Sequence, residues 1–191
     1  MNLAHRLQGQ VALITGGGGE IGTAIALRLA AEGSAIVVGD LEPQKAEETA
    51  QKVIAQGGRA TAIGVDVSDP AACEASVAFA MKSFEKLTTL VNVAATVIPD
   101  GTVETLTLEQ WNKALSVNLT GAFLMCKYGV PHMRAAGGGS IINIASQLGH
   151  MGVQHRAPYC TTKAALIFFT QILAQDHAPD NIRANSISPG F

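Results

Sequence analysis

The stretch VALITGGGGEIG, from Val11 to Gly22, combines an apolar run, a glycine-rich turn and the start of a helix. Residues 11–15 have the pattern of a strand that is covered on both faces. The glycines at 16–19 break this strand, and the alanine-rich segment from Glu20 predicts a helix that ends at Gly33. This order is the local context of a dinucleotide-binding loop, although a flexible turn can have the same composition.

The alternation of apolar runs and helical segments continues along the chain. Further strands are expected at residues 35–39, 60–65, 87–93, 140–145 and 182–187. Helices are expected from Pro43, from Pro70 after its cap Asp69, from the capping box Thr107-x-x-Gln110 with a kink or an end near Pro131, and around Tyr159 and Lys163. This alternation predicts an α/β fold: a doubly wound parallel sheet (a Rossmann fold) with helices on both faces, in a single domain over residues 1–191.

Several polar residues follow directly after the expected strands. In an open parallel sheet, ligands bind at the carboxyl ends of the strands, near the switch in strand order. The residues at those ends are Gly16, Asp40, Asp66, Asn92 and Ser146. We therefore expect them to contribute to one binding site.

Composition excludes several other classes of function. The 191 residues carry a formal charge of −2 and no basic stripe, which argues against nucleic acid as a partner. Cys73, Cys126 and Cys160 have no metal-binding spacing and are expected to be reduced. Residues 1–10 lack the apolar core of a signal peptide, and no apolar run is long enough to cross a membrane. These features predict a soluble cytoplasmic protein without a metal.

Tyr159 and Lys163 are spaced for acid–base chemistry. Positions four apart share one face of a helix, so the ammonium can lie beneath the phenol and favour the phenolate. Ser146, thirteen residues before Tyr159, ends an apolar strand, where its hydroxyl could bind a substrate oxygen. Taken alone, such a pair also occurs by chance, and Ser146 could equally cap a turn.

Asp40 indicates which dinucleotide the glycine loop would bind. It ends the second strand 24 residues after Gly16, where a carboxylate can accept hydrogen bonds from an adenosine ribose. A carboxylate there repels a 2′-phosphate, and no Arg or Lys lies in the glycine loop or directly after Asp40. The sequence therefore predicts NAD rather than NADP, although Asp40 could instead be a solvated cap before Pro43.

From the first strand onward, these motifs resemble the short-chain dehydrogenase/reductase family. Residues 15–22 are similar to its glycine loop, Asp66-Val67 to its adenine-contacting position, residues 92–95 to its Asn-Asn-Ala-Gly segment, and residues 188–190 to the turn beside the nicotinamide. The resemblance implies a set of cofactor-binding residues: Gly16, Gly18, Gly19, Glu20, Ile21, Gly22, Asp40, Leu41, Asp66, Val67, Asn92, Ala94, Tyr159, Lys163, Pro189 and Gly190. It also implies a catalytic tetrad: Asn118, Ser146, Tyr159 and Lys163.

The reaction that this resemblance implies is hydride transfer between a nicotinamide and an alcohol or carbonyl carbon. Tyr159 would exchange the proton, Ser146 would hold the same oxygen, Lys163 would bind the nicotinamide ribose, and Asn118 would hold a water that links Lys163 to solvent. The substrate is expected to meet Ser146, Gln147, His155 and Tyr159. The loop between Ser146 and Tyr159 is polar and partly basic, which favours a polyol, sugar or hydroxy acid over a steroid, unless the loop is simply solvated.

Two rival functions and three further expectations accompany this interpretation. One alternative is an NAD-binding regulator, which would not need the Tyr159/Lys163 pair. The other is a ketoacyl-carrier-protein reductase, which is expected to use NADP, whereas Asp40 disfavours NADP. Glu20 replaces the middle glycine of the family's loop and is expected to point to solvent. Apolar helices after Thr107 and around Tyr159 predict a homodimer or homotetramer. Because relatives continue beyond strand six, we also expect the native chain to extend past Phe191 with a further substrate-covering part.

Overall fold

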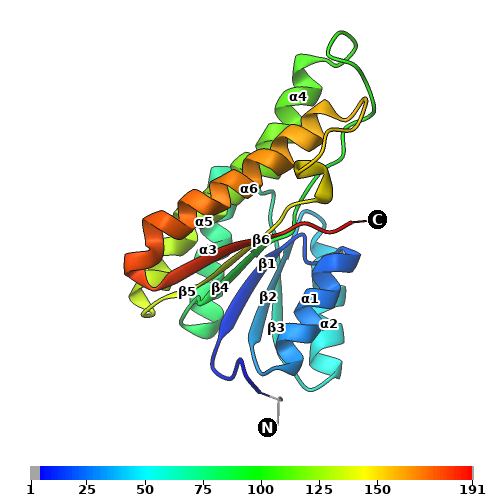
Figure 1. Ribbon diagram of the computed structural model, residues 1–191. Coiled ribbons are helices and arrows are strands. Elements are labelled where there is room, and N and C mark those ends of the chain that lie inside the picture. The colour runs from blue at the N-terminus through cyan, green and yellow to red at the C-terminus, as the bar shows by residue number, and fades with distance from the viewer. Residues whose placement is uncertain (1–4, 191) are drawn as a thin grey trace.

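A computed structural model describes residues 5–190 and contains a six-stranded sheet covered by helices on both faces (Figure 1). The strand order is β3-β2-β1-β4-β5-β6, and every neighbouring pair is parallel. The strands are β1 (Val11–Thr15), β2 (Ala35–Asp40), β3 (Arg59–Gly64), β4 (Thr89–Asn92), β5 (Gly139–Ile144) and β6 (Ile182–Ile187). The predicted doubly wound α/β fold is confirmed.

The helices lie on the two faces of the sheet. They are α1 (Glu20–Ala31), α2 (Pro43–Ala55), α3 (Pro70–Phe84), α4 (Leu108–Leu115), α5 (Gly121–Ala135) and α6 (Ala157–His177). Helices α1 and α2 cover one face, while α3, α5 and α6 cover the other (Figure 1). The change of face occurs between β1 and β4, so the switch point lies where Thr15 pairs with Asn92.

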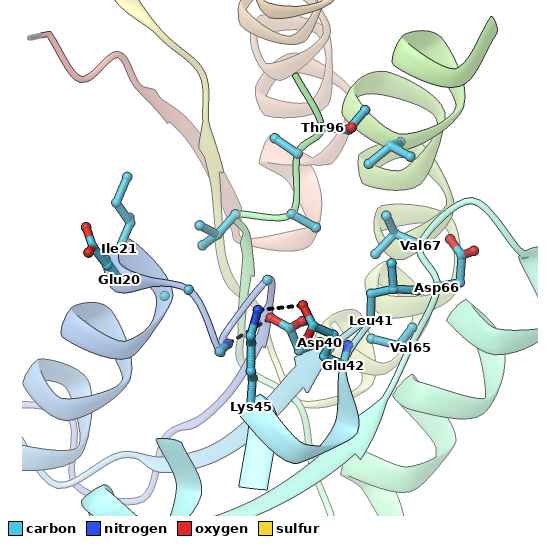
Figure 2. Close-up of a pocket in the computed structure, with 18 of the residues that line it drawn as sticks. Glu20, Ile21, Asp40, Leu41, Glu42, Lys45, Val65, Asp66, Val67 and Thr96 are labelled. Carbon is cyan, nitrogen blue, oxygen red and sulfur yellow. Dashed lines mark hydrogen bonds and ion pairs between the residues drawn. The ribbon is translucent and has the colours of Figure 1, made fainter. Parts of the chain in front are cut away.

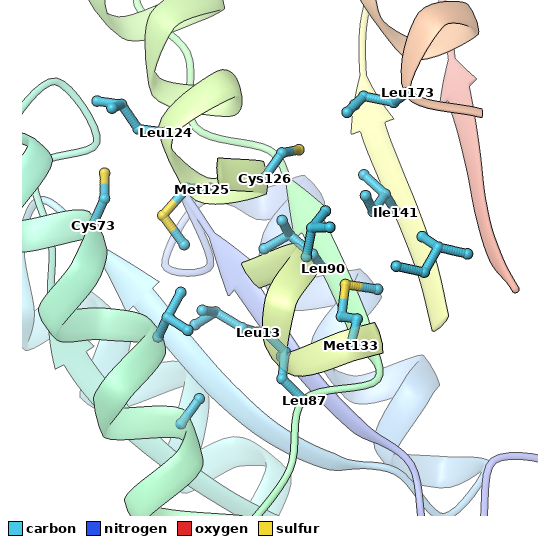
Figure 3. Close-up of a cluster of buried hydrophobic side chains, with 14 of the residues drawn as sticks. Leu13, Cys73, Leu87, Leu90, Leu124, Met125, Cys126, Met133, Ile141 and Leu173 are labelled. Carbon is cyan, nitrogen blue, oxygen red and sulfur yellow. The ribbon is translucent and has the colours of Figure 1, made fainter. Parts of the chain in front are cut away.

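Alternating side chains of the buried strands supply both cores. Leu13 and Val37 face α3 and α5, whereas Ile14 and Ile36 face α1 and α2. Figure 3 shows the larger core, in which Leu13, Leu90 and Ile141 pack under the methionines of α5. Burial of each such side chain contributes about 1.5–3 kcal/mol, so these rows fix the register of the sheet.

The segment from Thr107 differs from its prediction in one respect. The capping box is present, with Gln110 N donating to Thr107 Oγ1 and Thr107 N donating to Gln110 Oε1. Pro131 does not end the helix, because α5 continues through it to Ala135. The irregularity falls instead at residues Ser116–Thr120, a π-helical turn between α4 and α5. π-Turns of this kind re-aim side chains and are frequent at functional sites.

The described part of the chain contains no helix that is both long and apolar enough to span a lipid bilayer.

Candidate active site

Two cavities open at the carboxyl ends of the strands. The larger is a cleft of about 740 Å³ between the glycine loop, the end of β2 and the segment after β4 (Figure 2). The smaller is a pocket of about 480 Å³ beside the start of α6. Ile21, Val93 and Ala95 line both cavities, so a ligand in the cleft can extend into the pocket.

The glycine loop lies against the backbone that follows β4. Gly16 has a φ of +64°, and a Cβ atom added there would lie 2.7 Å from the backbone nitrogen of Ala94. Gly19 is the N-cap of α1, whose first amides have no partners within the helix and can bind an anion. Glu20 is exposed at the start of α1 on the rim of the cleft, as the sequence predicts.

Asp40 is fixed at the bottom of the cleft by two backbone amides. Its Oδ2 accepts a hydrogen bond from Gly18 N at 2.9 Å, and its Oδ1 accepts one from Glu42 N at 3.1 Å. Leu41, next to it, is exposed and lines the same cleft. The carboxylate is therefore held in a defined orientation beside the glycine loop.

Lys45 is a cleft residue that the sequence reasoning missed. The expectation that no basic residue follows directly after Asp40 is true of the sequence, but the first turn of α2 brings Lys45 back to the cleft. Its ammonium pairs with Glu42, which raises the pKa of Lys45 (Figure 2). Its position could have been found from the helix start at Pro43, because a side chain in the first turn lies close to the preceding strand end.

Asp66 and Val67 line the opposite wall of the cleft, as expected from their place after β3. Asp66 Oδ1 accepts hydrogen bonds from Ser68 Oγ at 2.6 Å and from Ser68 N at 2.9 Å. These bonds stabilise the carboxylate and hold the pKa of Asp66 below its ordinary value. The two bonds tie Asp66 to Ser68 in the turn that follows β3.

Asn92 is placed differently from its expected role as a cofactor contact. Its side chain is buried and Nδ2 donates to Asn143 Oδ1 at 2.8 Å, so it does not line the cleft. Asn143 Nδ2 in turn donates to Thr170 Oγ1 at 2.8 Å. The reason is the strand period of two, which puts Asn92 on the same face as Leu90, toward α5 and α6. Ala94, two residues later, does line the cleft.

Tyr159 and Lys163 lie on one face of α6, and both line the smaller pocket. Lys163 is only 2% exposed, and its Nζ donates to the carbonyl of Ile144 at 2.7 Å. Nζ lies 5.7 Å from the centre of the Tyr159 ring, which confirms that the two side chains are neighbours. Burial penalises the charged amine and lowers the pKa of Lys163 to about 8.

Ser146 follows β5 and lies in the same pocket as Tyr159. Its Oγ accepts a hydrogen bond from Leu148 N at 3.1 Å, so it caps the short 3₁₀ turn Gln147–Gly149. Ser146 therefore caps the 3₁₀ turn and also lines the pocket. The hydroxyl hydrogen remains available to an oxygen in the pocket, because Ser146 Oγ serves as the acceptor in the cap.

Asn118 connects three segments behind the pocket. It lies in the π-turn and is 1% exposed. Its Oδ1 accepts from Thr96 N at 2.7 Å, while Nδ2 donates to Thr96 O at 3.0 Å and to Thr162 Oγ1 at 3.2 Å. Asn118 thus ties the loop after β4 to α6, one residue before Lys163, and it does not line either cavity.

The loop between Ser146 and Tyr159 has a more apolar inner surface than its sequence indicates. Leu148 and Val153 line the pocket together with Val97 from the loop after β4. Gln147 lines it as expected, whereas His155 is exposed, with φ +64°, and lies outside the lining. Arg156 lines the pocket in its place.

The turn after β6 closes the side of the pocket opposite Val97. Pro189 and Gly190 both line the pocket, as expected. Gln147 N donates to the carbonyl of Pro189 at 3.0 Å, and His150 Nε2 lies 3.0 Å from Ser188 Oγ. The loop after β5 and the turn after β6 therefore form one continuous wall.

Known proteins share this sequence and architecture. Residues 10–191 match the family model for short chain dehydrogenase. The chain is 41% identical over 98% of its length to a 2,5-dichloro-2,5-cyclohexadiene-1,4-diol dehydrogenase of Sphingobium indicum, covering 75% of that protein. It is 35% identical over 99% of its length to a cyclohexanol dehydrogenase of Acinetobacter sp., again covering 75%.

A solved structure of an NAD⁺-bound xylitol dehydrogenase superposes with a TM-score of 0.94 at 36% identity, over 97% of this chain and 72% of that one. The match of the family model over nearly the whole chain and the identities to several dehydrogenases agree with the strand order and the paired cavities. The chain belongs to the short-chain dehydrogenase family and is an oxidoreductase.

Proposed function

We propose that this protein is an NAD-dependent dehydrogenase that interconverts a small secondary alcohol and its ketone. The observation that carries the proposal is the grouping of Ser146, Tyr159 and Lys163 in a pocket that shares three wall residues with the dinucleotide-sized cleft. The relatives named as cyclohexanol and xylitol dehydrogenases support an alcohol as the substrate.

The cleft residues fit a dinucleotide. A Cβ atom at Gly16 or Gly18 would collide with Ala94 or Lys45, so glycine allows these segments to pack closely at the cleft. A diphosphate could approach the N-terminus of α1, whose first amides have no partners within the helix. Asp40 would hold the adenosine ribose, Asp66 and Val67 would flank the adenine, and Lys163 would hold the second ribose. When bound, the nicotinamide would supply the hydride acceptor or donor.

The preference for NAD over NADP follows from the charges at Asp40. A 2′-phosphate would meet the Asp40 carboxylate, and the Lys45 ammonium that could offset it is already paired with Glu42. The three side chains together carry one net negative charge, which disfavours a phosphate dianion. We therefore assign NAD as the cofactor.

The chemistry of the chain's own residues is proton transfer and orientation. The Tyr159 oxygen would take the hydroxyl proton as the alcohol is oxidised and return it in the reverse direction. The Lys163 ammonium would stabilise the negative charge on that oxygen, and Ser146 Oγ–H would donate to the substrate oxygen. Asn118 would keep the loop after β4 and the start of α6 in register, through its bonds to Thr96 and Thr162.

A matched pair of tyrosine variants tests this assignment. Tyr159→Phe should reduce turnover at least a thousandfold while NAD affinity stays within about threefold, because only the proton carrier is lost. Tyr128→Phe, on α5 and outside both cavities, should keep wild-type activity. Turnover is followed as NADH absorbance over a panel of alcohols. If Tyr159→Phe retains most activity, the mechanism is wrong. If no alcohol reduces NAD although NAD binds, the regulator alternative is favoured.

A second experiment tests the cofactor. Calorimetric titration should give at least tenfold tighter binding of NAD than of NADP, and Asp40→Ser should reduce that ratio to near one or below. Asp176→Asn, an exposed carboxylate on α6, should leave the ratio unchanged. Equal affinities in the wild type would contradict the role of Asp40 and would favour the ketoacyl-reductase alternative.

We further propose that the protein assembles as a homodimer, or as a dimer of dimers, through α5 and α6. Phe123 on α5 and Phe168 and Ile172 on α6 are exposed, and the Phe123 ring lies 6.3 Å from Phe169. Such a row of large apolar side chains is more than one exposed helix face ordinarily carries. Sedimentation that shows only monomer at micromolar concentration would contradict this proposal.

A further inference from the structure

Arg156 is the feature of the smaller pocket that the proposed chemistry does not use. It is the N-cap residue of α6, and three positions later on the same helix is Tyr159. Positions three apart on a helix have Cβ atoms about 5–6 Å apart, so both side chains can reach one small ligand. The Arg156 side chain is 37% exposed and the residue belongs to the pocket lining, so it is accessible both to solvent and to a ligand in the pocket.

The guanidinium is oriented by contacts to the loop that follows β4. Arg156 Nε lies 2.7 Å from Asp100 Oδ1, and Gly101 N donates to the carbonyl of His155 at 3.1 Å. Gly101 and Arg156 also form an isolated parallel bridge, so the two loops are held side by side (Figure 1). Among the described residues, only Asp100 forms an ion pair with Arg156, through Nε. The guanidinium also carries two terminal nitrogens with further N–H donors.

The rest of the lining makes this charge unusual. Val97, Leu148 and Val153 form apolar walls, and Lys163 is the only other charged residue of the lining among residues 5–190. The Lys163 ammonium is turned toward the carbonyl of Ile144 and is almost fully buried. Arg156, which is paired with Asp100 through Nε, is therefore the more exposed of the two cations in this lining. A planar guanidinium fork binds a carboxylate with two parallel hydrogen bonds.

We infer that the substrate is a hydroxy acid, in which Arg156 binds the carboxylate while the secondary hydroxyl lies at Tyr159 and Ser146. This inference rests on the proposed dehydrogenase function and selects one class among the alcohols that the pocket could admit. The apolar walls fit a short hydrocarbon spacer or a ring between the two groups. Asp100, which is half-exposed, restrains the Arg156 guanidinium by its contact with Nε.

The experiment compares each acid with its uncharged amide. The panel contains 3-hydroxybutyrate, 4-hydroxyvalerate and 4-hydroxycyclohexanecarboxylate, their primary amides, and neutral alcohols such as cyclohexanol and xylitol, all followed as NADH formation. For at least one acid, wild-type kcat/KM should exceed that of its amide on the order of 10- to 100-fold, as expected for a charge-assisted bidentate contact. Arg156→Gln should lower kcat/KM for the acid much more than for the amide, so that the ratio falls toward one.

Two controls separate recognition from a merely structural role. Arg183→Gln removes an exposed arginine near the amino end of β6, far from the pocket, and should leave the acid-to-amide ratio unchanged. Arg156→Lys should restore part of the ratio, because it keeps the charge without the fork.

The outcomes are distinguishable. If Arg156→Gln lowers activity on acids and amides equally, the residue only supports the loops and the inference is overturned. If neutral alcohols are oxidised and no acid exceeds its amide, the inference also fails while the proposed function stands. If no compound reduces NAD, the proposed function itself fails, and the inference with it.

Discussion

The buried ammonium of Lys163 should make the stability of the protein depend on pH in a way that Lys163→Met abolishes. Burial lowers the pKa of Lys163 from 10.5 to about 8, whereas unfolding returns the side chain to water. Between these values the unfolded chain binds more protons than the folded one, so the free energy of unfolding rises with pH. The cost of the buried charge is fully present below pH 8 and is relieved above pH 10.5.

The magnitude follows from the two pKa values. One pH unit corresponds to about 1.4 kcal/mol, so the whole cost is about 3 kcal/mol, of which about 1 kcal/mol is relieved between pH 7 and pH 9. The wild-type free energy of unfolding, relative to that of Lys163→Met, should therefore increase by about 1 kcal/mol over this range. Other titrating groups are shared by both proteins and cancel in the difference.

Urea denaturation at pH 7 and pH 9, followed by the fluorescence of Trp111 at one fixed protein concentration, provides the measurement. Lys52→Met, an exposed position on α2, should keep the wild-type pH dependence. Identical pH dependence in the wild type and in Lys163→Met would refute the reasoning, because it would mean that the amine is not desolvated.

Two further predictions concern the glycine loop. Gly16→Ala should lower the free energy of unfolding by about 2–4 kcal/mol, because its Cβ would lie 2.7 Å from Ala94 N and its φ of +64° disfavours a side chain; an unchanged melting temperature would contradict this. Glu20→Gly should tighten NAD binding several-fold by removing a carboxylate from the rim of the cleft, while lowering the melting temperature because a good residue of the first helical turn is lost. Weaker NAD binding by the variant, measured by calorimetry, would show that Glu20 instead supports the site.

Much of the fold could be predicted because buried parallel strands leave a clear signal in the sequence. Strands β1 and β2 are covered on both faces, so they appear as apolar runs that end at a polar residue or a glycine. Helix starts were equally clear where a cap is followed by proline, as at Asp69, whose Oδ1 accepts from Ala71 N at 2.9 Å. Residues that sit on such elements, Tyr159 and Lys163 above all, were brought together as predicted.

The remaining features depend on contacts between distant segments. Arg156, and not His155, lines the pocket. Arg156 forms a bridge with Gly101, which lies more than fifty positions earlier in the sequence. The π-turn at Asn118 likewise accompanies that residue's two bonds to Thr96. The orientation of the Asn92 side chain, in contrast, could have been predicted from the sequence, because in a strand residues 90 and 92 face the same side of the sheet. Pro131 does not end its helix, and it lies on the exposed side of α5.

The site owes its shape to the point where the chain changes faces of the sheet. Because β1 and β4 are neighbours and their following segments run to opposite faces, no helix within residues 5–190 covers the gap above Thr15 and Asn92. The polar groups around that gap are held by nearby backbone: Asp40 by Gly18 N, Ser146 by Leu148 N and Lys163 by Ile144 O. A ligand that enters would meet groups already in position, so little ordering entropy is lost on binding. The burial of the Lys163 ammonium lowers the stability of the protein and is the cost of that arrangement. The pH dependence of the free energy of unfolding therefore tests the placement of Lys163 in the site as well as the fold.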